Sequence, residues 1–206
     1  MRLGFSALTP SDIDLLRSRC VSDENVHPDV LHAYHSNAEV ADYNNRMLNK
    51  IDKPLMTIRA TIKAPLGLAN RVSKSEDGRV GKTAFVEYLN VKVGARVKLI
   101  YNVWTFDGLV NGAMGNIVGI YKRPDGYVEF IAVEFDNPRT GTNQRLKYPR
   151  CTARFASKGG TPIFMHEMSF DLSARVNSGQ GTVTQFPLKL GWAQTSHSLQ
   201  VKNISQ

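Results

Sequence analysis

Hydrophobic and polar positions repeat with a helical period near the N-terminus of the chain. Apolar side chains share one helical face over residues 9–19 and again over residues 36–49, which predicts two helices. Each begins with a capping residue, Thr9 in the first and Ser36 in the second, and an acidic residue follows each cap three positions on. Residues 30–34 are mostly apolar and predict a short strand. A strand followed directly by a helix is the repeating unit of a parallel α/β sheet.

In the middle of the chain, apolar and polar positions repeat with a period of two residues. From Leu89 to Leu99 apolar residues alternate with polar ones, which predicts one strand with a solvent-facing side. Glycine-rich turns follow, and Pro124-Asp125-Gly126 predicts the turn of a hairpin. Several short strands at this spacing are typical of a small barrel or sandwich. The remaining expected strands are residues 56–62, 116–121, 127–135, 161–167 and 170–176.

These two patterns predict an α+β chain in which an all-β insertion interrupts an α/β beginning. Residues 1–85 are expected to hold the α/β beginning, with residues 50–83 as a connector. The insertion is expected over residues 86–178, which lies within the usual range of domain sizes. Residues 179–206 return to an apolar stretch at 185–200 and a polar tail. Because a parallel sheet needs more strands than these segments supply, we expect the α/β part to be incomplete.

The charge of the chain indicates a polyanionic partner. The net charge is +8 and the sequence pI is about 9.6, which favours nucleic acid or an acidic membrane face. A basic but otherwise ordinary surface is the alternative interpretation. The sequence has no apolar run of about 18 residues, so we expect no membrane-spanning segment and no membrane partner. Cys20 and Cys151 are far apart and predict reduced thiols of an intracellular protein. If the source is eukaryotic, we expect a nuclear location.

Sequence signals for nucleotide or metal chemistry are weak. Gly81-Lys82-Thr83 has the ending of a phosphate loop, but Glu76 stands where that motif needs its first glycine. We therefore interpret Lys82 as a solvated lysine of the connector. The histidines lack the spacing of metal ligands, so no metal site is predicted. No catalytic residue is assigned either.

Two groups of side chains in the predicted insertion are candidates for contact with nucleic acid. Lys92, Arg96 and Lys98 fall on the solvent-facing side of the predicted strand, where they can meet phosphates. A solvated strand face is the alternative interpretation. Trp104 lies in a glycine-rich loop, where an exposed ring can stack on bases. For Phe106 in the same loop, packing into the core of the barrel is the favoured interpretation.

Three blocks of the sequence resemble the RecD/Pif-type superfamily-one DNA helicases, including those of Helitron-like transposons. The first block comprises Arg2–Cys20, Leu31–Val40 and Asn44. The second comprises Leu89–Asn102, Gly108–Gly119 and Val133–Asp136. The third, Gln185–Gln200, is similar to a family motif that ends Thr-Ile-His-Lys-Ser-Gln-Gly, although Ser198 replaces its lysine and Val201 its final glycine.

The resemblance implies both a fold and a function. The fold is a partial second RecA-like motor domain with an inserted SH3-like β-barrel, and the partner is single-stranded DNA. ATP and Mg²⁺ serve the intact helicase, but Walker A and Walker B motifs are absent, so we expect no cofactor in this chain and a missing N-terminal helicase domain. The implied role is to hold single-stranded DNA without hydrolysing ATP. This role would form part of DNA unwinding in repair, recombination or transposition. The resemblance adds four DNA-binding candidates, Asn37, Thr195, His197 and Gln200. For His197, a structural role or no role is the alternative, because the neighbouring lysine is replaced.

Two other interpretations remain open at this point. SH3-like barrels of the KOW type also serve as stand-alone adaptors that bind nucleic acid or protein, and such an adaptor would not need the block Gln185–Gln200. A non-functional relic of a mobile element is the second alternative, which the replaced lysine and glycine of the third block favour.

Overall fold

The computed structural model describes residues 9–20, 30–65, 72, 74, 78–154, 159–172 and 179–196. The chain divides into two compact units, Met1–Val30 and Leu31–Gln206. In the first unit, helix α1 spans Pro10–Ser18. The predicted cap is confirmed, because the Thr9 hydroxyl accepts a hydrogen bond from the Asp12 amide at 3.3 Å, and the Asp12 carboxylate accepts one from the Thr9 amide at 3.0 Å.

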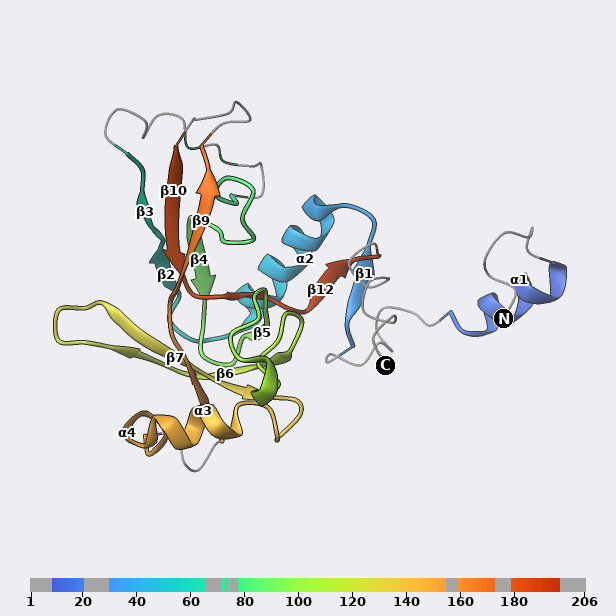
Figure 1. Ribbon diagram of the computed structural model, residues 1–206. Coiled ribbons are helices and arrows are strands. Elements are labelled where there is room, and N and C mark those ends of the chain that lie inside the picture. The colour runs from blue at the N-terminus through green and yellow to red at the C-terminus, as the bar shows by residue number, and fades with distance from the viewer. Residues whose placement is uncertain are drawn as a thin grey trace. The chain divides into compact units, whose positions relative to one another are not determined.

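The second unit contains the predicted strand and helix. Strand β1 spans His32–Tyr34 and helix α2 spans Asn37–Lys50, with a capping box in which Ser36 and Glu39 satisfy each other's amides. Strand β1 pairs in parallel with β12, Ala193–Thr195, from the far end of the chain (Figure 1). This pair and α2 form the α/β part of the fold.

The rest of the second unit consists of antiparallel sheets. In a five-stranded sheet the order is β11-β5-β6-β7-β8, in a three-stranded sheet it is β3-β10-β9, and β2 pairs with β4. These sheets are open, so the closed SH3-like barrel is not confirmed. The strand bounds are β2 Met56–Arg59, β3 Thr61–Lys63, β4 Tyr88–Val91, β5 Arg96–Leu99, β6 Met114–Lys122, β7 Val128–Phe135, β8 Thr161–Ile163, β9 His166–Asp171, β10 Gln180–Gln185 and β11 Leu188–Leu190.

The prediction of a single strand from Leu89 to Leu99 is wrong. The segment forms β4 and β5, which belong to different sheets. Between them Gly94 adopts φ +91°, a left-handed conformation that suits glycine and reverses the chain. The prediction that Lys98 faces solvent is also wrong, because this residue is only 5% exposed. Alternation alone did not reveal the turn, because the polar positions continue in phase across it.

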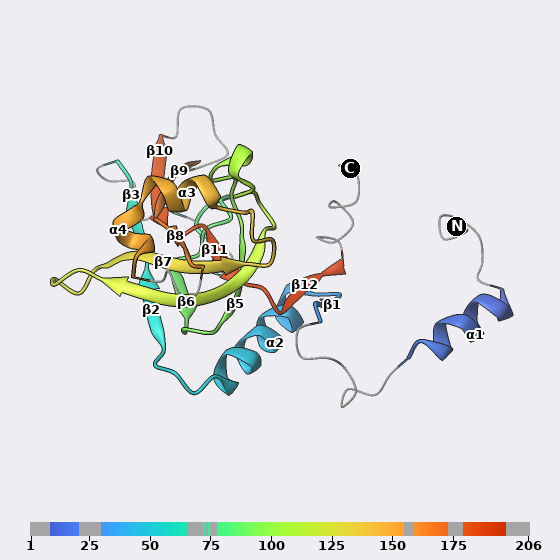
Figure 2. The same cartoon turned by 90° about the horizontal axis from the view of Figure 1, so that it is seen from below.

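Two helices that the sequence analysis did not predict follow the hairpin of β6 and β7. They are α3, Thr142–Lys147, and α4, Pro149–Thr152, and they pack beside β8 (Figure 2). A 3₁₀ turn, η3 at Thr105–Asp107, also contacts α3. Both helices are too short to show a clear helical period in the sequence.

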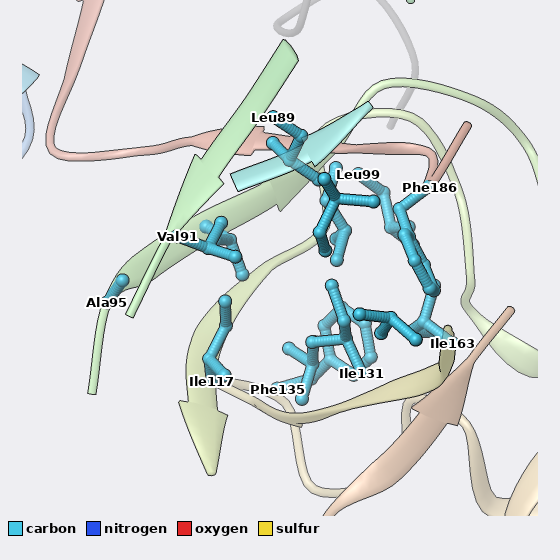
Figure 3. Packing of buried hydrophobic residues seen from close by; sticks show 14 of the residues in the cluster. Leu89, Val91, Ala95, Leu99, Ile117, Ile131, Phe135, Ile163 and Phe186 are labelled. Carbon is cyan, nitrogen blue, oxygen red and sulfur yellow. The ribbon is translucent and has the colours of Figure 1, made fainter. Parts of the chain in front are cut away.

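The main hydrophobic core is built mostly from side chains of the five-stranded sheet and β4 (Figure 3), with Leu48 of α2 and Ile58 of β2 added to it. Phe186, which lies between β10 and β11, is fully buried in it and packs with Leu99 and Ile163. Burial of each such side chain contributes about 1.5–3 kcal/mol. A second cluster around Phe85, Phe170 and Val183 belongs to the three-stranded sheet and its neighbours.

Candidate functional site

A groove of about 350 Å³ lies between α2 and residues near β4 and β11. Its polar lining consists of amide groups, two basic side chains and one tyrosine, and among the described residues that line it none is acidic. Such a surface suits an anionic ligand with flat rings, because cations neutralise phosphates and an aromatic face stacks on bases. The exposed members of this set are Asn37, Asn45, Arg79, Tyr88, Asn90 and Lys189.

The wall of the groove formed by β4 is held by an ion-pair cluster next to Tyr88. The Glu87 carboxylate lies 2.6 Å from Lys74 Nζ and 3.5 Å from the Arg59 guanidinium. The hydrogen bond from Lys74 lowers the pKa of Glu87 below its ordinary value. Arg59 also lies 5.8 Å from the centre of the Tyr88 ring, which is 51% exposed. These contacts position the tyrosine at the surface of the groove.

The opposite wall is α2, which is fixed to β12 by one buried side chain. The Asn44 amide donates a hydrogen bond to the Ala193 carbonyl at 3.3 Å and accepts one from the Ala193 amide at 3.0 Å. A second contact fixes α2 to β1, because Tyr43 Oη and His32 Nε2 are 2.7 Å apart. The start of α2, with the exposed Asn37, is thereby held beside the parallel strands.

The structure brings two of the predicted DNA-binding residues to the same end of the parallel pair. Tyr34 is the register partner of Thr195, so both strands end there, and Asn37 follows three residues after Tyr34. Ligands of α/β proteins bind outside the carboxyl ends of parallel strands. Thr195 is partly buried and Asn37 is exposed. His197 and Gln200 lie outside the described residues.

The structure does not bring Lys92, Arg96 and Lys98, the three basic residues predicted to contact DNA, together on one exposed surface. Lys92 Nζ donates to the Ile51 carbonyl at 2.9 Å. Arg96 forms a bidentate ion pair with Asp136 at 2.5 Å, and the buried Lys98 donates to Gln194 Oε1. Each charge serves a contact within the fold, and a role of these residues in DNA binding stays a prediction.

Phe106 is a surface residue that the sequence analysis assigned to the core. Its side chain is 98% exposed, so the interpretation as core packing is wrong. The turn that carries it is firmly anchored, because the buried Asp107 carboxylate accepts hydrogen bonds from the Asn143 and Gln144 amides, both at 2.8 Å. The predicted residue Trp104 is partly buried beside this turn. A sequence signal for the exposure exists in retrospect, since Asp107-Gly108 is typical of a turn.

The segment that resembles the end of a phosphate loop has the structure of a simple turn. The Thr83 amide and hydroxyl both donate to the Val80 carbonyl, at 3.1 Å and 2.6 Å. Gly81 has φ +58° and packs against Phe170, and a strand bridge at Val86 follows in place of a helix. Without a helix N-terminus the turn does not fit the phosphates of ATP. Lys82 is exposed, as the sequence analysis expected.

The described residues contain no group of three or more His, Cys, Asp or Glu side chains placed to hold a metal ion. Over the same residues, no helix is long and apolar enough to cross a membrane.

Comparison with known proteins shows similarity to Pif1 helicases. No protein-family model matches the chain. The ATP-dependent DNA helicase Pif1 of Campylobacter jejuni is 26% identical over 192 residues, which cover 89% of this chain and 36% of the relative. Pif1 from Bacteroides bound to ADP-AlF4 superimposes with a TM-score of 0.58 at 20% identity, over 92% of this chain and 36% of that structure. Pif1 from Candida albicans gives a TM-score of 0.58 at 21% identity, over 91% and 40%.

The resemblance to Pif-type superfamily-one helicases that the sequence motifs indicate is therefore confirmed. The mixed α/β fold corresponds to part of the Pif1 structures, and the chain spans 36% of the length of the curated relative that it matches. Bacteroides Pif1 has also been crystallised with single-stranded DNA, in a structure that matches this chain with a TM-score of 0.57 at 20% identity and over 94% of its length.

Proposed function

We propose that the chain forms the part of a Pif1-like DNA helicase that holds single-stranded DNA. The observation that carries this proposal is the groove beside α2, whose lining combines Arg79 and Lys189 with amide groups and the exposed ring of Tyr88. The similarity to Pif1 helicases, which include a structure bound to single-stranded DNA, supports the same partner.

The chemistry of the groove assigns different tasks to its side chains. Lys189 and Arg79 attract the phosphate backbone without regard to sequence, while the amides of Asn37 and Asn90 can bond to phosphates or base edges. The ring of Tyr88 offers a stacking surface for any base. This combination is suited to a strand that must be held at any sequence, as a translocating helicase requires.

The proposal includes no ATP site in this chain. The described residues offer no phosphate loop, and ATP binding and hydrolysis with Mg²⁺ are assigned to the domain that the resemblance places before this segment. We also propose that the antiparallel strands within residues 86–178 correspond to the SH3-like insert, although β2, β3, β10 and β11 from outside that range pair in the same sheets. The parallel pair β1-β12 with α2 is assigned to the second RecA-like domain. On this proposal the isolated chain binds DNA but neither hydrolyses ATP nor unwinds a duplex.

Binding of a fluorescein-labelled thymidine oligonucleotide, followed by fluorescence anisotropy at several salt concentrations, tests the proposal. We expect affinity to fall linearly with the logarithm of salt concentration, because bound phosphates release counterions. Lys189→Ala should weaken binding and reduce that slope by about one. Lys63→Ala is the matched control, since Lys63 is an exposed lysine of β3 that does not line the groove.

The same titration distinguishes the proposed function from the two alternatives, an adaptor and a non-functional relic. Binding that is independent of salt, or equal losses in both variants, would contradict the proposed groove. Failure of the wild-type chain to bind any oligonucleotide would favour the adaptor that recognises a protein, or the relic.

A further inference from the structure

A second cavity, of about 280 Å³, lies between η3, α3 and the segment that joins β8 to β9. It shares no lining residue with the groove beside α2. Trp104, Tyr148 and Phe164 provide its aromatic walls, and Lys147 is the charged side chain that lines it. Neither α3 nor α4 contains an acidic residue, so the surroundings contributed by these helices are basic. The cavity therefore combines flat apolar walls with a positive charge.

The aromatic walls are arranged around the lysine. Lys147 Nζ lies 5.7 Å from the centre of the Trp104 ring and 5.6 Å from that of Tyr148. The rings of Tyr148 and Phe164 are 4.7 Å apart at an angle of 53°. Stacking of a nucleobase on an aromatic ring is stronger than an exposed cation–π contact. A base can therefore displace the ammonium group from these rings and leave it free to pair with a phosphate.

The cavity also contains polar groups that can bond to a base edge. His166 is partly buried, and burial lowers the pKa of its imidazole, which favours the neutral form with one donor and one acceptor. Gln144 is buried and fixed, because its Nε2 donates to the Pro162 carbonyl at 3.1 Å. A neutral, mixed donor and acceptor set suits the edge of an uncharged heterocycle.

Hydrogen bonds within the fold hold the backbone of the cavity walls. The backbone of Trp104 exchanges hydrogen bonds with Leu109, with both N–H···O distances at 3.1 Å. Asp107 fixes the start of α3 through the Asn143 and Gln144 amides. A site that is already ordered loses little conformational entropy on binding, which favours affinity.

We propose that this cavity binds one unpaired nucleobase of a nucleic-acid strand, stacked on Trp104 and Tyr148, with Lys147 at the neighbouring phosphate. The inference rests on the proposed function and adds a base-binding position separate from the groove beside α2. The exposed Phe106, two residues after Trp104, offers a further ring for the adjacent base.

Intrinsic tryptophan fluorescence of the full chain tests this directly. The chain contains two tryptophans, of which Trp192 is 9% exposed and belongs to the core, whereas Trp104 lines the cavity. We expect a thymidine oligonucleotide to quench the fluorescence and Trp104→Phe to remove the quenching. Trp104→Ala should lower affinity about tenfold, within the range expected for one stacked base. Its thermal unfolding midpoint is measured in parallel to confirm that the variant is folded.

An oligonucleotide of the same length in which abasic residues replace the nucleosides is the control ligand. It should still bind by anisotropy through its phosphates but should not quench Trp104. Anisotropy that shows binding without quenching, or equal quenching by the abasic strand, would overturn the base-binding cavity and leave the proposed function intact. If neither oligonucleotide binds, both the base-binding cavity and the proposed function are overturned.

Discussion

At the scale of single residues, Asn37 connects helix stability with DNA binding. It occupies the first turn of α2, is exposed and lines the groove. We predict that Asn37→Asp raises the free energy of unfolding by about 0.3–1 kcal/mol, because a negative charge is favourable at a helix N-terminus. The same charge repels phosphate and should weaken binding of single-stranded DNA. Chemical denaturation and anisotropy measure the two effects separately.

Asn49→Asp is the matched control for this prediction. Asn49 is exposed in the last turn of α2 and does not line the groove. A negative charge there opposes the helix dipole, so stability should fall slightly while DNA binding changes little. Equal losses of DNA affinity in the two variants would show that overall charge, and not the position of Asn37, determines binding.

Glu87 predicts a pH dependence of stability. Its pKa is lowered in the folded chain, mainly by the hydrogen bond from Lys74. A lowered folded pKa contributes stability above the unfolded value, near 4.5, that is lost as the pH falls through the folded value. We expect Glu87→Gln to lack this component. Urea unfolding of both proteins between neutral pH and pH 3 checks the prediction, and parallel stability profiles would contradict it.

At the scale of secondary-structure elements, the attachment of α2 to β12 depends on Asn44. Asn44→Ala leaves the buried amide and carbonyl of Ala193 without these side-chain partners. We predict a loss of about 1–3 kcal/mol in the free energy of unfolding. Asn45→Ala changes an exposed neighbour on the same helix and should alter stability by no more than about 0.5 kcal/mol. Similar denaturation midpoints for the two variants would show that the hydrogen bonds between Asn44 and Ala193 contribute little to stability.

The elements that the sequence predicts well are those specified by local chemistry. The caps at Thr9 and Ser36 and the hairpin turn at Gly126 follow from side-chain hydrogen bonds and backbone preferences within a few residues, and the structure confirms them. The interruption at Gly94 escaped prediction, because alternation of polar and apolar residues does not report backbone direction. The burial of Lys98 depends on Gln194, a partner 96 residues away that no local pattern reveals.

At the scale of the whole second unit, long-range pairing creates the candidate site. Strand β1 finds its parallel partner β12 near the other end of the described chain, with His32 opposite Ala193. Sequence motifs identified Asn37 and Thr195 as candidates, and this pairing places them at one end of the two strands. The contribution of Arg79, Tyr88 and Lys189 to the groove was not predicted, because these residues come from separate segments and carry no shared motif.

Crosslinking of bound DNA tests the groove most directly. A thymidine oligonucleotide that contains 4-thiothymidine is bound to the full chain and irradiated, and the modified peptides are identified by mass spectrometry. Adducts are predicted on peptides that contain residues 37–45, 79–90 or 189–190, because each of these segments includes residues that line the groove. Adducts confined to the three-stranded sheet of β3, β9 and β10, in a chain that binds the oligonucleotide, would contradict the proposed grip on single-stranded DNA.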